Sequence, residues 1–187
     1  MRVIAGIHRS RRLKGPGKLR LRPTSDRLRE TLFNVLGAAI EDSLFVDLYA
    51  GTGAIGIEAA SRGAREVILV ELHKATARLA RGNIDALGIR GNVEVVEDDT
   101  LRGLEKLAGR HLLADFIFLD PPYEKSGEYL KVLEYLDCAR LVAPHGIVIV
   151  EHRDNMELPG RFERLERTRL LGQGNVALSF YSLAAAA

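Results

Sequence analysis

The chain has 187 residues, a length that suits one domain with a sizeable core. No apolar run approaches the roughly 20 residues that span a bilayer, and the first residues lack a signal-peptide pattern, so we expect no membrane attachment. The one cysteine, Cys138, excludes an internal disulfide and fits a reducing compartment, which predicts a cytoplasmic protein. The five histidines show no metal-ligand spacing, so we expect no metal site.

The formal net charge is only +2, but the charges are unevenly distributed. Residues 1–30 hold ten basic and two acidic side chains, a net charge of +8, and the rest of the chain carries −6. A basic segment on an acidic body favours a polyanionic partner such as nucleic acid. The alternative is a solvated, partly mobile terminus.

The first predicted elements lie in and just after this basic segment. Residues 3–5 predict a short strand, and Gly15-Pro16-Gly17 predicts a turn. A helix is predicted at about 25–39, because apolar residues recur there at helical spacing and Thr24 or Ser25 can cap its start.

Five short apolar runs, rich in β-branched and aromatic residues, predict strands. They are residues 44–46, 67–70, 93–96, 116–119 and 147–150. Segments with helical periodicity lie between some of them, at 75–87 and 126–141. This alternation predicts an α/β fold with a mainly parallel sheet, and the continuous apolar runs indicate strands covered on both faces.

The end of the chain has a different pattern. Residues 162–171 and 176–183 predict two strands around the turn Gly172-Gln173-Gly174, with no helix between them. We therefore expect an antiparallel hairpin at one edge of the sheet.

A glycine-rich loop follows the first of the five strands and opens a helix at about Ala54. Its spacing, Gly51-x-Gly53-x-x-Gly56, matches the nucleotide-cofactor fingerprint in the required strand–loop–helix context. Glycines let the backbone turn sharply and approach a ligand closely. The alternative is a tight turn whose small residues serve packing alone. The predicted cofactor-binding residues are Asp47, Ala50, Gly51, Thr52, Gly53, Gly56, Glu71, Asp99 and Asp120.

The acidic residues near this loop bear on which cofactor it takes. Glu71 ends the second strand and can bind a ribose hydroxyl pair, which NAD and S-adenosylmethionine both carry. Asp47, just before the loop, can attract a cationic ligand or orient the loop, and it suits a sulfonium better than a pyrophosphate. Asp99, in the Asp98-Asp99 pair, can accept a hydrogen bond from an adenine amino group. Together these residues favour S-adenosylmethionine.

The most specific motif is Asp120-Pro121-Pro122-Tyr123, which follows the strand at 116–119. Prolines cannot donate backbone hydrogen bonds and they stiffen the local path. The result is a cluster of acceptors beside an aromatic ring, which suits the exocyclic amine of a nucleobase. We predict that these four residues are catalytic; the alternative is a rigid turn with a surface tyrosine.

Four stretches carry a resemblance to a known family. They are residues 22–34, 47–59, 120–123 and 150–152. Over about residues 2–183 the chain resembles the class I S-adenosylmethionine-dependent methyltransferases and, among them, the bacterial RsmD-like ribosomal RNA small-subunit guanine-N2 methyltransferase family. That family's early hairpin usually carries Gly-Gly and Arg-Gly-Arg. Here it reads Ala5-Gly6 and Arg9-Ser10-Arg11, so two glycines are replaced.

The resemblance implies a Rossmann-like seven-stranded sheet, mostly parallel with an antiparallel C-terminal hairpin, plus a small basic N-terminal extension. We expect the extension and its helix at 1–40, the methyltransferase domain at 41–183 and a tail at 184–187. The implied activity is methyl transfer from S-adenosylmethionine to N2 of one guanine in small-subunit ribosomal RNA, within a partly assembled subunit.

The reaction hypothesis assigns a role to each part of the site. Asp120 and the Pro121 carbonyl would accept the two N2 hydrogens, and Tyr123 would stack on the extruded base. Arginines and a lysine near the N-terminus would bind RNA phosphates. These residues are Arg9, Arg11, Arg12, Lys14, Arg20, Arg22, Arg27 and Arg29. Arg27 and Arg29 are two apart on a helix and point different ways, so the alternative for one of them is to pair with Glu30 or to pack inward. On this view, removing residues 1–20 weakens RNA binding and spares the cofactor.

Three other functions remain open at this point. An adenine-N6 methyltransferase acting on DNA or RNA would use the same acceptors, although no segment is long enough for the usual target-recognition insertion. An NAD-dependent oxidoreductase would need a hydride-transfer acid or base, and neither a Tyr-x-x-x-Lys pair nor a placed histidine is evident. A non-catalytic RNA-binding assembly factor would not need the amine-binding motif.

Overall fold

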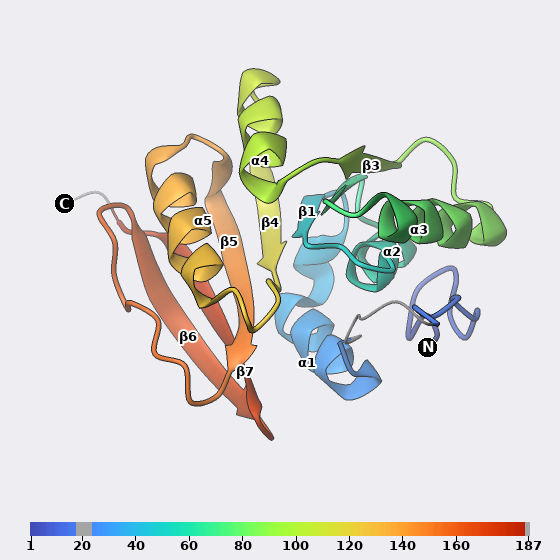
Figure 1. Cartoon of the computed structure of the whole chain (residues 1–187), viewed down its shortest axis with the longest axis horizontal. Coiled ribbons are helices and arrows are strands. Elements are labelled where there is room, and N and C mark those ends of the chain that lie inside the picture. Colours follow the sequence, from blue (N-terminus) through green and yellow to red (C-terminus); the bar gives the residue numbers. More distant parts are fainter. Residues whose placement is uncertain (18–23, 186–187) are drawn as a thin grey trace. The chain divides into compact units, whose positions relative to one another are not determined.

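The computed structural model describes residues 1–17 and 24–185, which form two compact units, Met1–Thr100 and Leu101–Ala187 (Figure 1). Counting both, the fold contains a seven-stranded mixed sheet, parallel except where its C-terminal strands pair. The predicted α/β class is therefore confirmed. The division at residues 40 and 183 stays a prediction.

The first unit alternates strands and helices after an N-terminal helical segment. Its elements are α1 (Asp26–Leu36), a 3₁₀ turn (Gly37–Ile40), β1 (Leu44–Leu48), α2 (Ala54–Ser61), β2 (Glu66–Glu71), α3 (Lys74–Leu87) and β3 (Val93–Glu97). The strands lie in the order β3-β2-β1 and pair in parallel. Ser25 caps α1, because its Oγ accepts a hydrogen bond from the amide of Leu28 at 3.1 Å.

The second unit ends in long antiparallel strands. Its elements are α4 (Thr100–Gly109, whose first residue belongs to the first unit), β4 (Ala114–Leu119), α5 (Ser126–Cys138), β5 (Val142–Arg153), β6 (Leu165–Gln173) and β7 (Val176–Leu183). The order is β4-β5-β7-β6, with β4 and β5 parallel. The C-terminal hairpin was predicted, and β6 lies at the edge as expected.

The burial of each element explains why some sequence patterns predicted it and others did not. Every residue of β1 is buried, and so are five of the six in β2, as expected for strands covered on both faces. The helix α4 was not predicted, although its residues Leu104 and Leu107 are buried and lie on one face of the helix. Residues 3–5 do not form a regular strand; the bridge there is an isolated one between Arg2 and Arg12.

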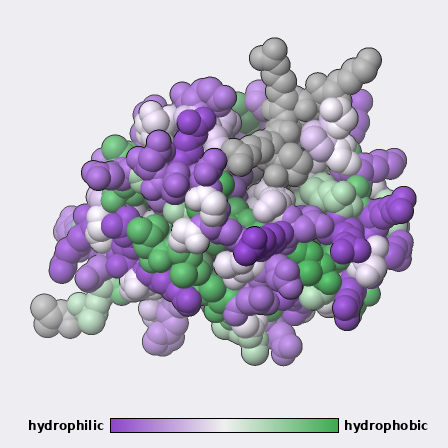
Figure 2. Space-filling model, turned by 90° about the horizontal axis from the view of Figure 1, so that it is seen from below, coloured by the Kyte–Doolittle hydropathy of each residue, from purple (hydrophilic) through white to green (hydrophobic). Residues whose placement is uncertain are grey.

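The face in Figure 2 is mainly hydrophilic, with separate hydrophobic patches. Among residues 1–17 and 24–185, the large exposed apolar side chains are Ile7, Leu72, Leu113, Leu130 and Leu170. Within residues 1–17 and 24–185, no helix has the length and hydropathy to cross a membrane. The same part of the chain contains no group of three or more side chains placed to hold a metal ion.

Candidate active site

The loop after β1, residues 49–53, is held in a strained conformation. Tyr49, Gly51 and Gly53 all have left-handed backbones, with φ of 65°, 57° and 79°. For Tyr49 this region costs roughly 1–2 kcal/mol, because its Cβ crowds the backbone. Such strain persists only where surrounding contacts fix the backbone, and it is common at ligand sites.

Two buried carboxylates supply those contacts. Asp47, on β1, is 2% exposed, and its Oδ2 accepts a hydrogen bond from the amide of Gly56 at 3.1 Å. Glu71, at the end of β2, accepts from the amides of Gly51 (2.9 Å, Oε2) and His73 (2.8 Å, Oε1). Of the two roles foreseen for Asp47, the structure therefore shows the orienting one. Ribose binding by Glu71 stays a prediction. The remaining lone pairs of its carboxylate oxygens would accept the hydrogen bonds from the ribose hydroxyls.

The loop glycines have different tasks. A Cβ on Gly56 would lie 2.2 Å from Leu69 Cδ2, so this glycine lets α2 pack closely on β2. A Cβ on Gly51 would meet nothing nearer than 3.8 Å, so space remains beside the loop backbone there. A ligand can approach the backbone at Gly51, and the loop therefore fits a bound cofactor.

Further acidic residues lie at the same edge of the sheet. Glu71 pairs in register with Glu97, and the half-buried Asp98 and Asp99 follow directly. Asp98 Oδ1 accepts a hydrogen bond from the amide of Asp99 at 2.8 Å. Ligands of open α/β sheets bind at this carboxyl edge. An acidic edge suits a cationic sulfonium cofactor and disfavours a pyrophosphate; adenine recognition by Asp99 stays a prediction.

The motif Asp120-Pro121-Pro122-Tyr123 follows β4 in the second unit. Asp120 and Tyr123 are half-buried, Pro121 is buried and Pro122 is exposed. The carbonyl of Pro121 accepts a hydrogen bond from the buried Tyr129 hydroxyl at 3.3 Å, and that of Pro122 accepts from the Lys125 amide at 2.8 Å. Each carbonyl keeps a second lone pair, so the motif still presents acceptors, now held in place by α5 and its N-terminal turn.

Tyr123 is held by a cation. The guanidinium carbon of the exposed Arg153, at the end of β5, lies 4.8 Å from the centroid of the Tyr123 ring. At an exposed position such a contact is worth about 0.5–1 kcal/mol. It restrains the ring of Tyr123; stacking of a base on this ring stays a prediction.

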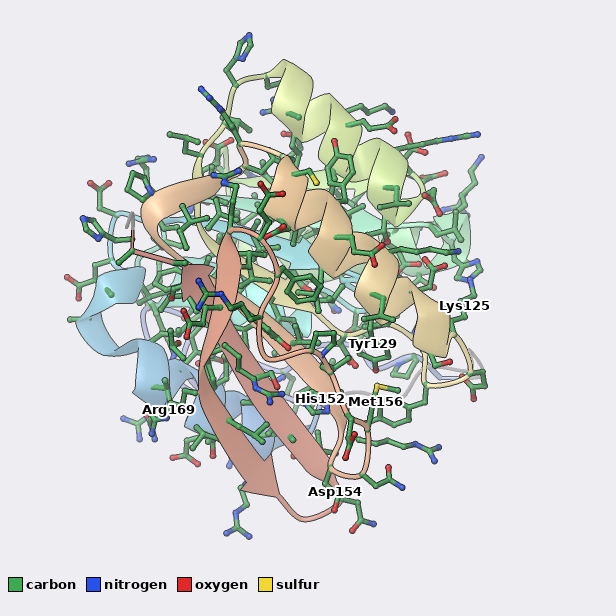
Figure 3. The ribbon with its side chains drawn as sticks, turned by 90° about the vertical axis from the view of Figure 1, so that its left-hand side faces the viewer. Lys125, Tyr129, His152, Asp154, Met156 and Arg169 are labelled. Carbon is green, nitrogen blue, oxygen red and sulfur yellow. The ribbon has the colours of Figure 1, made fainter. Side chains whose placement is uncertain are left out.

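His152 lies near the end of β5, one residue before Arg153 (Figure 3). It is 2% exposed, with Nδ1 at 2.8 Å from the Arg153 carbonyl oxygen and Nε2 at 2.8 Å from Ser179 Oγ. A carbonyl only accepts, so Nδ1 carries the proton and Nε2 accepts from the serine hydroxyl. Burial lowers the pKa of His152, and the nearby Arg167 lowers it further, against the bond to the Arg153 carbonyl. The neutral imidazole therefore stabilises the end of β5, where Arg153 lies, through its hydrogen bonds to the Arg153 carbonyl and to Ser179 on β7.

The basic N-terminal segment forms a folded hairpin, residues 1–14. The amide of Val3 donates to the Arg11 carbonyl at 3.0 Å, and the amide of Ser10 to the Val3 carbonyl at 2.9 Å. The predicted RNA-binding residues Arg9, Arg11, Arg12, Lys14 and Arg27 are all exposed. Arg20 and Arg22 lie outside the described residues.

Arg29 departs from the RNA-binding prediction. Its side chain is completely buried, and Nη2 donates to the Arg2 carbonyl at 2.6 Å and to Asp26 Oδ1 at 2.9 Å. Nε lies 3.9 Å from Oε2 of the equally buried Glu58. Burial lowers the pKa of Arg29, and the two carboxylates oppose that shift. Arg29 therefore ties the hairpin to α1 and α2, and it cannot reach a phosphate.

Comparison with known proteins identifies the family. A family model described as "Conserved hypothetical protein 95" matches residues 1–182. Escherichia coli ribosomal RNA small subunit methyltransferase D is 35% identical over 159 residues, 85% of this chain and 78% of that protein. The Bacillus subtilis protein named "Putative rRNA methyltransferase YlbH" is 33% identical over 181 residues, 97% and 98% of the two chains. The chain belongs to the ribosomal RNA small subunit methyltransferase D family.

Solved structures agree with this assignment. The structure described as "Putative methyltransferase yhhF from Escherichia coli" matches with a TM-score of 0.86 at 32% identity, covering 100% of this chain and 99% of that one. An RNA methyltransferase from Salinibacter ruber, solved with S-adenosyl-L-homocysteine, matches with a TM-score of 0.66 at 17% identity, covering 89% and 96%. At that identity the second match shows the fold alone, which is the class I methyltransferase fold expected from the sequence.

Two residues of the hairpin have left-handed backbones. Ser10, which the resemblance matches to a family glycine, has a φ of 67°, and Gly6 has a φ of 79°. A Cβ on Gly6 would lie only 1.7 Å from the carbonyl oxygen of Ser61. The hairpin therefore keeps the glycine at its contact with α2 and tolerates a serine at its exposed end.

Three structurally important residues were not singled out from the sequence. Tyr129 lies on the apolar face of the predicted helix at 126–141, and Glu58 lies in a stretch of small residues. Asn83 falls on the apolar face formed by Ala80, Ile84 and Leu87, and it is 1% exposed. A polar side chain on such a face is the signal that could have found them, because a buried polar group needs hydrogen-bond partners.

Proposed function

We propose that this member of the family transfers a methyl group from S-adenosylmethionine to the exocyclic N2 of a guanine in small-subunit ribosomal RNA. The observation that carries the proposal is the motif Asp120-Pro121-Pro122-Tyr123 at the end of β4, in a chain whose relatives are named as ribosomal RNA methyltransferases. We further propose a partly assembled small subunit as substrate, and action in the cytoplasm, where such particles form.

The residues that would hold the cofactor belong to the first unit. The backbone of Gly51 offers space for close approach, Glu71 would bind the ribose hydroxyls, and Asp99 would accept from the adenine amine. When bound, the sulfonium cofactor supplies an activated methyl group. The buried Asp47 acts indirectly, by holding the start of α2 through the amide of Gly56.

The chain's task is to direct a poor nucleophile, because the N2 lone pair of guanine is delocalised into the ring. Asp120 would accept one N2 hydrogen, and the second lone pair of the Pro121 carbonyl would accept the other. Holding both hydrogens aims the nitrogen lone pair and stabilises the positive charge that develops on it. The proton is released after transfer, because N2 would carry a positive charge once it has gained the methyl group, and such a cationic nitrogen is strongly acidic.

Tyr123 and the hairpin would bind the RNA. Stacking on Tyr123 is worth roughly 1–3 kcal/mol, comparable to the few kcal/mol that unstacking a base costs. The exposed cations Arg9, Arg11, Arg12 and Lys14 would neutralise phosphates, so affinity would fall steeply with salt.

The test is methyl transfer by Asp120 variants. Asp120→Ala is expected to lower the turnover rate on undermethylated small-subunit RNA or particles by roughly 10²-fold or more, with cofactor affinity largely kept. Asp154→Asn, an exposed carboxylate after β5, is the matched control and is expected to be silent. Turnover of Asp120→Ala at the wild-type rate would remove Asp120 from the mechanism.

A further inference from the structure

The N-terminal hairpin is fixed to α2 by the backbone of residues 4–8. The amides of Ile4 and Ala5 donate to the two carboxylate oxygens of Glu58 at 2.7 and 2.9 Å. The amide of Ile7 donates to the Ser61 carbonyl at 2.8 Å, and the Ser61 hydroxyl donates to the Ala5 carbonyl at 2.6 Å. The hairpin is thus a docked element of the first unit.

A buried side chain connects this hairpin to the cofactor loop. Asn83, on α3, accepts a hydrogen bond at Oδ1 from the amide of Lys14 at 2.8 Å. Its Nδ2 donates to the carbonyl of Lys14 at 3.1 Å and to the carbonyl of Thr52 at 3.0 Å. Both Nδ2 hydrogens and the oxygen are therefore in use, one side facing the end of the hairpin and the other facing the loop.

Thr52 lies between the two left-handed glycines of the strained loop, and it is 6% exposed. A second, weaker contact reaches it from the hairpin, because its Oγ1 lies 3.8 Å from Met1 Sδ. A loop held in a costly conformation depends on all of its external hydrogen bonds. Losing the contact at Thr52 would therefore loosen the backbone around Gly51, where the cofactor approaches.

We infer that Asn83 is a positioning residue that couples the N-terminal hairpin to the cofactor loop, so that docking of the hairpin raises the affinity for S-adenosylmethionine. By reciprocity, RNA bound on the hairpin changes cofactor affinity by the same factor as cofactor changes RNA affinity. This second statement rests on the proposed RNA-binding function; the first does not. The first statement replaces the expectation that removal of residues 1–20 would leave the affinity for the cofactor unchanged.

The test is cofactor affinity in the absence of RNA, measured by calorimetry on the full chain. Asn83→Ala removes the link itself. Gly6→Ala undocks the hairpin from a distance, since its Cβ would meet the Ser61 carbonyl at 1.7 Å while the loop and α3 are untouched. Each is expected to weaken binding of S-adenosylmethionine by roughly 5-fold or more, a typical size for coupling between sites. Asp85→Ala, an exposed residue on the same helix, is the matched control.

The double variant distinguishes coupling from general damage. If both changes act through one link, Gly6→Ala adds little to the affinity lost in Asn83→Ala. A merely structural Asn83 would lower the melting temperature and leave the dissociation constant of the folded protein unchanged. Unchanged affinity in Asn83→Ala or Gly6→Ala, or fully additive losses in the double variant, would overturn the inference.

Adding an RNA fragment of the small subunit tests the reciprocal part. Cofactor affinity of the wild type is expected to shift on RNA binding, and that shift is expected to vanish in Asn83→Ala. If the wild type binds cofactor but neither the RNA fragment nor a partly assembled small subunit, the proposed substrate fails while the link between hairpin and loop stands on its own measurement. If the wild type does not bind S-adenosylmethionine at all, both proposals fail.

Discussion

Glu71 Oε2 accepts a hydrogen bond from the amide of Gly51 at 2.9 Å, which joins the end of β2 to the loop after β1. The other oxygen of the same carboxylate accepts from the amide of His73 at 2.8 Å. One buried acid thus fixes two backbone turns at the carboxyl edge of the sheet. An amide side chain could not do this, because its NH₂ group would face a backbone N–H.

Glu71→Gln is therefore expected to weaken S-adenosylmethionine binding by at least about tenfold, equivalent to about 1.4 kcal/mol. The control is Glu97→Gln. Glu97 lies beside Glu71 on the neighbouring strand, but its carboxylate forms only a half-exposed ion pair with Arg81. Calorimetric titration of both variants measures the difference. Equal affinities for the two would show that Glu71 does not organise the cofactor loop.

Tyr129→Phe removes the hydroxyl that holds the Pro121 carbonyl and keeps the buried ring. A net hydrogen bond of this kind contributes about 0.5–1.5 kcal/mol, so we expect a modest loss of stability. We also expect a several-fold fall in turnover at unchanged cofactor affinity, because the Pro121 carbonyl is less well aimed. Tyr135→Phe, on the same helix, is expected to keep wild-type turnover. Identical rates in the two variants would count against an active role for the Pro121 carbonyl.

His152 makes the folded protein sensitive to acid. Burial holds its pKa below the usual value of about 6.5, so the unfolded chain binds this proton more readily than the folded one. The contribution is fully present above about pH 6.5 and is lost as the pH falls through the lowered pKa, at up to about 1.4 kcal/mol per pH unit. Denaturant unfolding between pH 7.5 and 5 is expected to show this slope in the wild type and a shallower one in His152→Gln. Parallel pH profiles would refute the assignment.

Ser10→Gly is expected to stabilise the protein. The left-handed backbone costs a non-glycine residue roughly 1–2 kcal/mol, and glycine offsets part of this gain through its greater freedom in the unfolded chain. A net gain of about 0.5–1 kcal/mol would raise the melting temperature by roughly 1–4 °C. Arg9→Gly, at a neighbour that is not left-handed, is expected to give no gain. A lower melting temperature for Ser10→Gly would mean that the serine side chain has a stabilising contact.

The sequence predicted β1 to β5, because these strands are apolar runs bounded by turns, but the strand expected at residues 3–5 does not form. The helix α4 was missed although Leu101, Leu104 and Leu107 recur at helical spacing; it contains Gly103, a residue of low helix propensity. The conformation of the N-terminal hairpin was not predicted from the sequence pattern for another reason. Its backbone is held by turns within the hairpin and by side chains on α2 and α3, and such contacts leave no periodic trace in the sequence.

The candidate site was predicted in part for similar reasons. The spacing of the glycines and the motif after β4 are local patterns, so both could be recognised in the sequence. Residues that hold the site from other elements, such as Asn83 and Tyr129, are visible only through tertiary contacts. Arg29 was predicted to bind RNA together with Arg27, although residues two apart on a helix point in different directions. Its burial depends on carboxylates, one of them on a different helix.

The most direct test of the central claim is the position of the transferred methyl group. Undermethylated small-subunit RNA, naked and within particles, would be incubated with this protein and S-adenosylmethionine labelled in its methyl group, then digested to nucleosides. The account predicts label in N2-methylguanosine, with none when Asp120 is replaced by alanine. Label in N6-methyladenosine, or no transfer to either substrate by protein that binds the cofactor, would contradict it.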